Sequence, residues 1–269
     1  MTAIDATVAP EQFDIGRVIV RTLKVFGRNF PVFLFLAAIG TAPSEFLLWI
    51  WMKSLLSGAG GVSMSMAMWS NLPLLIFAYI AFVILVSLAQ AAIAYGAIAA
   101  LNGKSASISD CFSTSLNSLG PLVGIGVLKT LGVALGALLL IVPGINVALM
   151  WSVAIPVRVV ERTSISDSFS RSEQLTLGHR WAIFGLAVIF VLAGVAAELP
   201  VRLFLILSRL PMVHQAIPVL TAVTIYWTAH AVLRTVTTSF GAVGVASIYY
   251  ELLLIKGVMA PKQVEAVFS

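Results

Sequence analysis

Long apolar stretches alternate with short polar joints along most of this 269-residue chain. A helix needs about 20 apolar residues to cross the hydrocarbon core of a bilayer. The stretches are long enough, rich in Leu, Ala and Gly, and lack the two-residue alternation of a barrel strand. The pattern therefore predicts an all-α polytopic membrane helical bundle of about six transmembrane helices, over residues 30–52, 72–101, 119–142, 144–157, 181–199 and 217–255.

Proline and glycine mark the expected irregularities of these spans. We expect Pro43 to kink the first span, Pro143 and Gly144 to form the turn before the fourth, and Pro200 to break or kink the fifth. As one helix the last span would be about 58 Å long. It should therefore bend near Gly241 and Gly244 or project into water.

Two segments have the pattern of amphipathic surface helices. In residues 13–28, the basic residues Arg17, Arg21, Lys24 and Arg28 recur at helical spacing, and Ile15, Ile19, Leu23 and Phe26 supply an apolar face. Such a helix is attracted to anionic lipid headgroups, by about 1 kcal/mol per basic residue. An equally favoured alternative is that this helix is a juxtamembrane anchor whose only role is to set the topology of the chain. The charged stretch 158–180 predicts a second such helix, with a cap at Ser164 and Asp167 and an end at Gly178.

Composition and charge add the domain organisation and the orientation. Apolar residues make up 60% of the chain and charged residues 10%, against about 25% charged in a typical soluble domain. We expect a polar tail over 1–12 without the pattern of a cleaved signal peptide, one membrane domain over 13–257, and a tail over 258–269. Cys111 is the only cysteine, which excludes an intrachain disulfide.

Basic residues are distributed unequally between the two sides of the predicted bundle. Lys53, Arg202 and Arg209 fall on one side, and Lys129 and Arg234 lie at membrane depth. Eleven of the sixteen lie on the other side: Arg17, Arg21, Lys24, Arg28, Lys104, Arg158, Arg162, Arg171, Arg180, Lys256 and Lys262. The positive-inside rule predicts that both termini are cytoplasmic, in a multi-pass protein of the bacterial inner membrane.

Small residues predict how two of the spans pack. Gly120, Gly124, Gly132 and Gly136 form a stripe on the third span, and Ala89, Ala92, Gly96 and Ala100 form one on the second. Small residues let helices approach closely in lipid. Because a short link joins these spans, we expect the two stripes to meet, with packing against a second copy as the alternative.

Ionisable residues at membrane depth are candidates for a functional site. Lys129 lies near the middle of the third span, at a depth where Gln90 of the second could hydrogen-bond it. Glu45 is level with Glu198 and Arg202, and either carboxylate could neutralise that arginine. A structural pair is favoured there over a proton relay.

The last span carries a polar stripe. Tyr226, His230, Arg234 and Thr238 repeat every four residues and share one helix face, which Thr224, Thr228 and Thr235 broaden. This face should be turned to the bundle interior or to a hydrated cavity, where Arg234 could bind a phosphate or carboxylate. The favoured alternative is that Arg234 extends to the interface and His230 bonds a neighbouring helix.

Motifs of catalysis and cofactor binding are missing. The sequence has no His-Glu-x-x-His pair, no Gly-x-Ser-x-Gly elbow and no phosphate-binding glycine loop. It therefore predicts no catalytic residue, no metal site, no cofactor and no nucleic-acid partner.

Three segments are similar to the bacterial membrane-domain family named after glycerophosphoryl diester phosphodiesterase. They are FDIGRVIVRTLKVFGRNFPVF at 13–33, the region 141–186 with VPGI, WSVAIPVRVVER and SFSRSEQLTLGHRWAIFGL, and Tyr249-Tyr250-Glu251-Leu252. In that family the active carboxylates belong to a separate soluble domain, which this chain lacks. The resemblance implies a stand-alone six-span membrane module and carries over no catalytic residue.

The leading expectation is a non-enzymatic membrane module that binds anionic lipid, a partner membrane protein or a second copy of itself. The alternative is a small-molecule or lipid transporter that uses the polar face of the last span. A membrane hydrolase would require Glu45, Glu198 and His230 to converge on one cavity, and it ranks below both.

Overall fold

The computed structural model describes residues 12–57, 72–104, 107–208 and 218–257. These residues form an all-α bundle without strands, so the predicted fold class is confirmed. The predicted tails at 1–12 and 258–269 lie almost wholly outside the described residues. The helices are α1 (Ile15–Arg28), α2 (Phe30–Ser57), α4 (Leu72–Leu101), α5 (Ile108–Asn117), α6 (Leu119–Leu139), α7 (Ile141–Met150), α8 (Ala154–Glu161), α9 (Ile165–Thr176), α10 (Arg180–Leu207) and α12 (Val219–Ile255).

Six helical segments in the described part are long and apolar enough to cross a membrane. They lie at Phe30–Lys53, Tyr79–Leu101, Leu119–Leu139, Ile141–Glu161, Arg180–Leu207 and Val219–Ile255. The chain is accordingly a multi-pass membrane protein. The fourth segment is made of two helices, since α7 ends at Met150 and α8 begins at Ala154.

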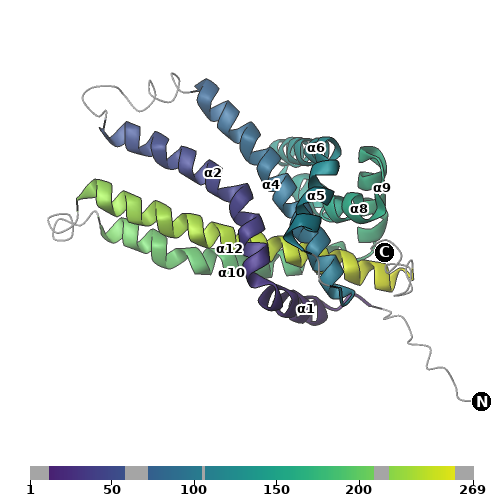
Figure 1. Ribbon diagram of the computed structural model, residues 1–269. Coiled ribbons are helices and arrows are strands. Elements are labelled where there is room, and N and C mark those ends of the chain that lie inside the picture. The colour runs from purple at the N-terminus through teal and green to yellow at the C-terminus, as the bar shows by residue number, and fades with distance from the viewer. Residues whose placement is uncertain (1–11, 58–71, 105–106, 209–217, 258–269) are drawn as a thin grey trace, which may run out of the picture.

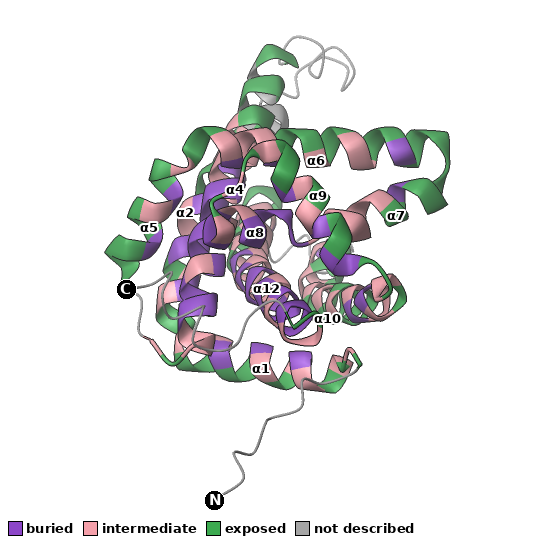
Figure 2. Ribbon diagram, turned by 90° about the vertical axis from the view of Figure 1, so that its right-hand side faces the viewer, coloured by how far each residue is buried: buried purple, intermediate pink, exposed green. Residues whose placement is uncertain are grey.

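The six segments do not all run in the same direction. Helices α2, α4, α10 and α12 run lengthwise through the molecule, whereas α6 is seen nearly end-on (Figure 1). In the view turned by 90°, α6 and α7 run across the picture and α12 is seen nearly end-on (Figure 2). The hairpin of α6 and α7 therefore lies crosswise to the long helices. Its tip is apolar and open, with Leu138 to Val142 each at least 68% exposed.

The three prolines act differently from one another. Pro43 lies in the middle of α2, and α2 changes direction along its length (Figure 1), as predicted for a proline that removes a backbone donor. Pro200 does not break its span, because α10 continues to Leu207. Pro143 lies in the first turn of α7, where backbone N–H groups have no acceptor within the helix, so the lack of an N–H costs no hydrogen bond. The turn itself is at the extended residue Leu140, earlier than predicted.

Helix α12 is one continuous helix of 37 residues, with no break at Gly241 or Gly244. A helix of this length measures about 55 Å. The buried core lies mainly around its C-terminal half, which packs against α1, α4 and α10 (Figure 2). Gly244 lies against Phe190 of α10, because a Cβ there would be 2.2 Å from the ring.

The predicted meeting of the two small-residue stripes is wrong. Gly132 of α6 faces the ring of Trp151, and Gly136 faces Gly144 of α7. On α4, Ala89 packs against Gly40 of α2. A Cβ added to Gly40 would lie 2.6 Å from the Cβ of Ala89. The stripes serve two different neighbours because α6 crosses α4 rather than running beside it. The contact between α4 and α6 uses Ser87 and Gly126 instead.

The charged stretch after α8 forms the predicted second helix, α9. Ser164 caps it by accepting the backbone N–H of Asp167 at 3.2 Å. The helix ends before Gly178, whose φ of +88° is a left-handed conformation that glycine adopts without strain.

Candidate functional site

A buried carboxylate and two basic side chains meet between α2 and α12. Glu45 of α2 is 6% exposed. Its Oε1 lies 3.1 Å from Nε of Arg234, and its Oε2 lies 3.4 Å from Nδ1 of His230. A lone charge inside a membrane domain is expensive to maintain, and opposite charges at this distance stabilise one another. Glu45 therefore neutralises the charge of Arg234 on the polar stripe of α12.

The local structure of α12 explains this arrangement. His230 and Arg234 are four residues apart, so one face of the helix carries both to the same carboxylate. Tyr226, one turn earlier, stacks on His230 with ring centroids 5.7 Å apart. One turn before Glu45 in α2, the hydroxyl of Thr41 lies 2.8 Å from that of Thr235. Together these contacts hold α2 and α12 in one register.

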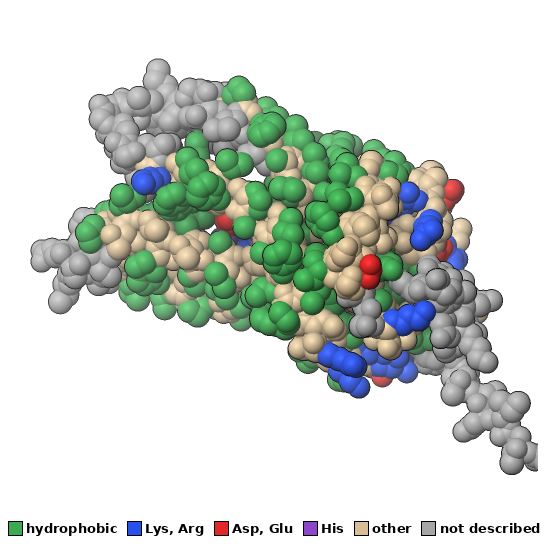
Figure 3. Space-filling model, in the orientation of Figure 1, with side chains coloured by type: hydrophobic (Ala, Val, Ile, Leu, Met, Phe, Trp, Pro, Cys, Tyr) green, Lys and Arg blue, Asp and Glu red, His purple; other side chains and the backbone are tan. Residues whose placement is uncertain are grey.

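The cluster borders a cavity of about 340 Å³ between α2, α4 and α12. The lining residues are Ser44, Glu45, Leu48, Tyr79, Phe82, Trp227, His230 and Arg234. Figure 3 shows acidic and basic side chains in a hollow between α2 and α12, surrounded by hydrophobic side chains. The guanidinium of Arg234 also lies over the ring of Phe82, 5.6 Å from its centroid.

Two further cavities adjoin this one. A cavity of about 570 Å³ between α4 and α6 shares Tyr79 and Phe82 with it. A cavity of about 420 Å³ between α2 and α12 shares Glu45 and Trp227 with it. We refer to these three adjoining cavities as the membrane cleft. A cleft with apolar walls and a few charged groups matches the general form of ligand sites.

The predicted intramembrane site residues are only partly brought together. Lys129 and Gln90 line the same cavity, with no hydrogen bond between them. His230 and Arg234 line the adjoining cavity, and Tyr226 contributes by stacking on His230. Thr238 is half-buried and lines none of the three cavities. His230 approaches Glu45 of the neighbouring helix without a hydrogen bond, and Arg234 pairs with Glu45 rather than extending to the interface.

Glu45 and Arg202 do not pair with each other, although the sequence offered this pair as one possibility. Arg202 binds Glu198 on its own helix at 2.5 Å, whereas Glu45 binds His230 and Arg234 on another. Glu198 does not converge with Glu45 and His230, which removes the geometry expected of a hydrolase built on these three.

The four basic residues predicted to face lipid headgroups divide into two pairs. Arg17 and Arg21 of α1 both bind the carboxylate of Glu251, which is completely buried in α12; Arg17 Nε lies 2.8 Å from Oε1. Lys24 and Arg28 are exposed. Only this second pair is thus free of ion pairs in the part of the chain that the structure describes.

Glu251 belongs to a network that fastens the end of α12. The hydroxyl of Tyr249 donates to Glu161 of α8 at 2.9 Å. Arg171 of α9 binds the same carboxylate at 3.2 Å, and Arg21 lies over the ring of Tyr250. The segment Tyr249-Tyr250-Glu251-Leu252 is therefore structural. The feature of the sequence that could have indicated this role is Glu251, a single acidic residue among apolar residues at the end of the last span.

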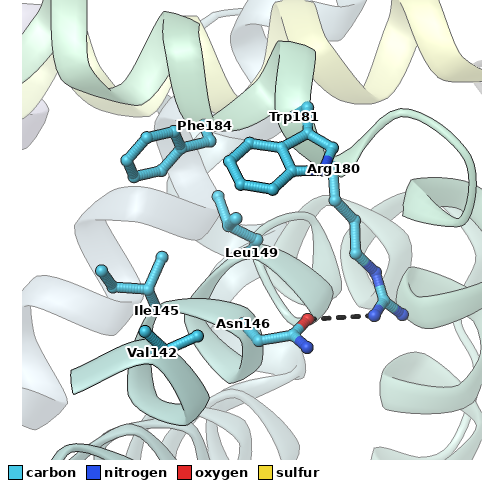
Figure 4. A pocket seen from close by; sticks show the side chains of 7 residues that line it. All are labelled: Val142, Ile145, Asn146, Leu149, Arg180, Trp181 and Phe184. Carbon is cyan, nitrogen blue, oxygen red and sulfur yellow. Dashed lines mark hydrogen bonds between the residues drawn. The ribbon is translucent and has the colours of Figure 1, made fainter.

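A further cavity of about 360 Å³ lies between α7 and the start of α10. Figure 4 shows Arg180 donating to the side-chain oxygen of Asn146, at 3.0 Å, beside Trp181 and Phe184. Trp181 is 86% exposed. An exposed tryptophan beside an arginine is typical of the boundary between lipid and water.

Chemically reactive groups are few in the described residues. Within these ranges, no group of three or more His, Cys, Asp or Glu side chains could hold a metal ion. Burial raises the pKa of the Cys111 thiol to about 11, and the nearby Asp110 raises it further in the same direction. Burial also lowers the pKa of His179, as does the charge of Lys256. Neither group has the environment of an activated nucleophile or base.

The chain was compared with protein families, curated proteins and solved structures. No protein-family model matches it, and no curated protein or solved structure is significantly similar to it. The site described above is accordingly interpreted from its own geometry.

Proposed function

We propose that this chain is a non-enzymatic integral membrane module that binds a lipid or a similar amphiphile in the membrane cleft. The observation that carries the proposal is the cluster of Glu45, His230 and Arg234 at the wall of a 340 Å³ cavity. An amphiphile fits such a cleft because its polar group can meet the cluster and its chain can follow the apolar wall.

The proposal includes a topology and a family. We place the protein in a bacterial inner membrane with both termini in the cytoplasm, because the basic residues are concentrated on one side. The similarity of segments 13–33, 141–186 and 249–252 to the phosphodiesterase membrane-domain family supports a membrane domain of that kind. Lys24 and Arg28 would then face anionic headgroups of the inner leaflet, while a partner protein or second copy could cover the tip of the α6–α7 hairpin.

The experiment is lipid retention by a cleft-filled protein, measured by native mass spectrometry of the full chain. Leu48→Trp and Ala134→Trp together place large side chains in two of the adjoining cavities. We expect this variant to retain less than half of the lipid bound to the original protein. Leu192→Trp on the exposed side of α10 is the control, with no expected loss. Equal lipid retention by the cleft-filled variant would contradict the proposal.

Transport of a small molecule or lipid is the second candidate. It is favoured by the polar stripe of α12, whose His230 and Arg234 line a cavity and are not sealed by apolar side chains. Binding sites at broken or kinked helices are common in transporters, and Pro43 interrupts the backbone hydrogen bonding of α2 next to the cavity residues Ser44 and Glu45. Lipid scrambling or solute uptake in vesicles containing the protein would distinguish transport from binding alone.

A further inference from the structure

Lys129 has no acidic partner among the residues that the structure describes. It lies at the middle of α6, ten residues from Leu119 and ten from Leu139. No Asp or Glu is among the residues that line its cavity. In the part of the chain described by the structure, no ion pair or hydrogen bond involves its ammonium group. This contrasts with Arg234, whose charge is met by Glu45 in the adjoining cavity.

The position of the cavity makes water an unsuitable partner. Gln90, which lines the same wall, is the central residue of the candidate span Tyr79–Leu101. At this depth an isolated ammonium group is costly, and such groups normally pair or serve a ligand.

Lys129 supplies the only charged group among the residues that line the cavity. The hydroxyls of Ser87 and Thr130 use their protons on carbonyls of their own helices, at 2.7 and 2.8 Å. The side chain of Gln90 can donate or accept, whereas the ammonium of Lys129 can only donate. The chemical complement of this cationic donor is an oxygen group with a negative charge.

The remaining wall is apolar. Val83 and Val86 of α4 face Val133, Ala134 and Ala137 of α6 across a volume of about 570 Å³. Small and branched side chains of this kind suit an alkyl chain but offer nothing to a hydrophilic anion. The cavity therefore combines one cationic point with an apolar wall.

We infer that the cavity between α4 and α6 is a binding site for the anionic group of an amphiphile, with Lys129 as its counter-charge. The anionic group is a phosphate or a carboxylate, and the alkyl chain lies along the wall of Val83, Val86, Val133 and Ala137. This inference rests on the proposed function and adds to it the charge of the ligand and the residue that selects it.

The test uses the full chain in neutral detergent, titrated with phosphatidylglycerol, phosphatidylcholine or oleate and followed by native mass spectrometry. We expect the original protein to bind an anionic ligand about tenfold more tightly than phosphatidylcholine, which corresponds to one ion pair. A preference for phosphatidylglycerol identifies a phosphate and a preference for oleate identifies a carboxylate. Lys129→Met should abolish the preference, and Lys129→Arg should retain it.

Three outcomes separate this inference from the proposed function. Loss of the anionic preference in Lys129→Met, with unchanged binding of phosphatidylcholine, supports both. An unchanged preference in Lys129→Met overturns the inference, while lipid loss in the cleft-filled variant would still support the proposed function. Equal binding of all three ligands by the original protein also overturns it. A thermal unfolding midpoint equal to that of the original protein verifies that the Lys129→Met variant is folded.

Discussion

At the scale of the residue, Glu45 lies between His230 and Arg234 within otherwise apolar helices. Replacing it by Gln leaves two basic side chains in the cavity without a negative charge. We expect the free energy of unfolding to fall by about 2 to 4 kcal/mol, less than for a fully buried pair because Arg234 is 40% exposed. Equilibrium unfolding in mixed micelles measures this loss.

Glu198→Gln is the matched control, since it removes a carboxylate that pairs within one helix to a 57% exposed arginine. This change should alter the stability by less than about 1 kcal/mol. Equal losses for the two variants would show that Glu45 is not a structural counter-ion.

Cys111 gives a second prediction for a single residue. Its side chain is completely buried and its pKa is raised to about 11, so at pH 8 only about one thiol in a thousand is the reactive thiolate. Maleimide should label the folded protein very slowly, with a rate that rises steeply with pH and on unfolding. Ser113→Cys in a Cys111→Ser background, at an exposed position of the same helix, should react rapidly at pH 8.

At the scale of the element, α1 illustrates what a helical pattern can and cannot predict. The spacing of its basic residues predicts a helix with one charged face, and residues Ile15–Arg28 are helical. The same pattern fits both a lipid headgroup and a buried acid, and only the chain fold brings Glu251 next to Arg17 and Arg21. Likewise, the four-residue spacing of His230 and Arg234 predicts that they share one face of α12. It does not identify Glu45 as their partner, because that contact depends on how α2 packs against α12.

The two halves of the basic face of α1 should respond differently to mutation. Arg17→Ala with Arg21→Ala leaves Glu251 buried without a partner, and should destabilise the protein by about 3 to 5 kcal/mol. Lys24→Glu with Arg28→Glu should leave stability within about 1 kcal/mol and reduce anionic lipid retained on purification. Unfolding in micelles and lipid analysis of both variants measure these effects, and the reverse pattern would contradict the assignment.

The hairpin of α6 and α7 depends on a close approach of two backbones. A Cβ on Gly144 would lie 2.7 Å from the backbone nitrogen of Ala137, which cannot move aside as a side chain could. We expect Gly144→Ala to destabilise the protein by about 1 to 3 kcal/mol. Gly120→Ala, with open space around the added Cβ, should be neutral or stabilising. Thermal unfolding of both variants provides the comparison.

At the scale of the whole molecule, the number of apolar segments does not give their directions, because the hairpin of α6 and α7 lies crosswise to the long helices. Hydropathy predicts the six apolar segments, all of which are helical in the described part, but it ends the fifth at residue 199 whereas α10 continues to Leu207. It contains no information on direction, which depends on contacts such as Gly132 with Trp151. For the same reason the apolar pattern could not show that the α6 stripe packs against α7.

The crosswise arrangement predicts the accessibility of the hairpin tip. In a Cys111→Ser background, Leu140→Cys should be unreactive to a membrane-impermeant maleimide added to either side of sealed vesicles. A helix that crossed the whole bilayer would expose this residue, which lies at the turn between α6 and α7, on the far side. Rapid labelling from the outer side would therefore contradict the crosswise position, and Lys53→Cys at the exposed end of α2 is the positive control.

The bond between Arg21 and Glu251 joins residues that are 230 positions apart in the chain. A ribosome synthesises α1 first and α12 last, so the nascent α1 must wait for its partner through nearly the entire period of synthesis. During that time Glu251 is missing, and phospholipid phosphates would be available to neutralise the arginines of α1. Final maturation would consist of an exchange in which a glutamate of the last helix displaces those phosphates.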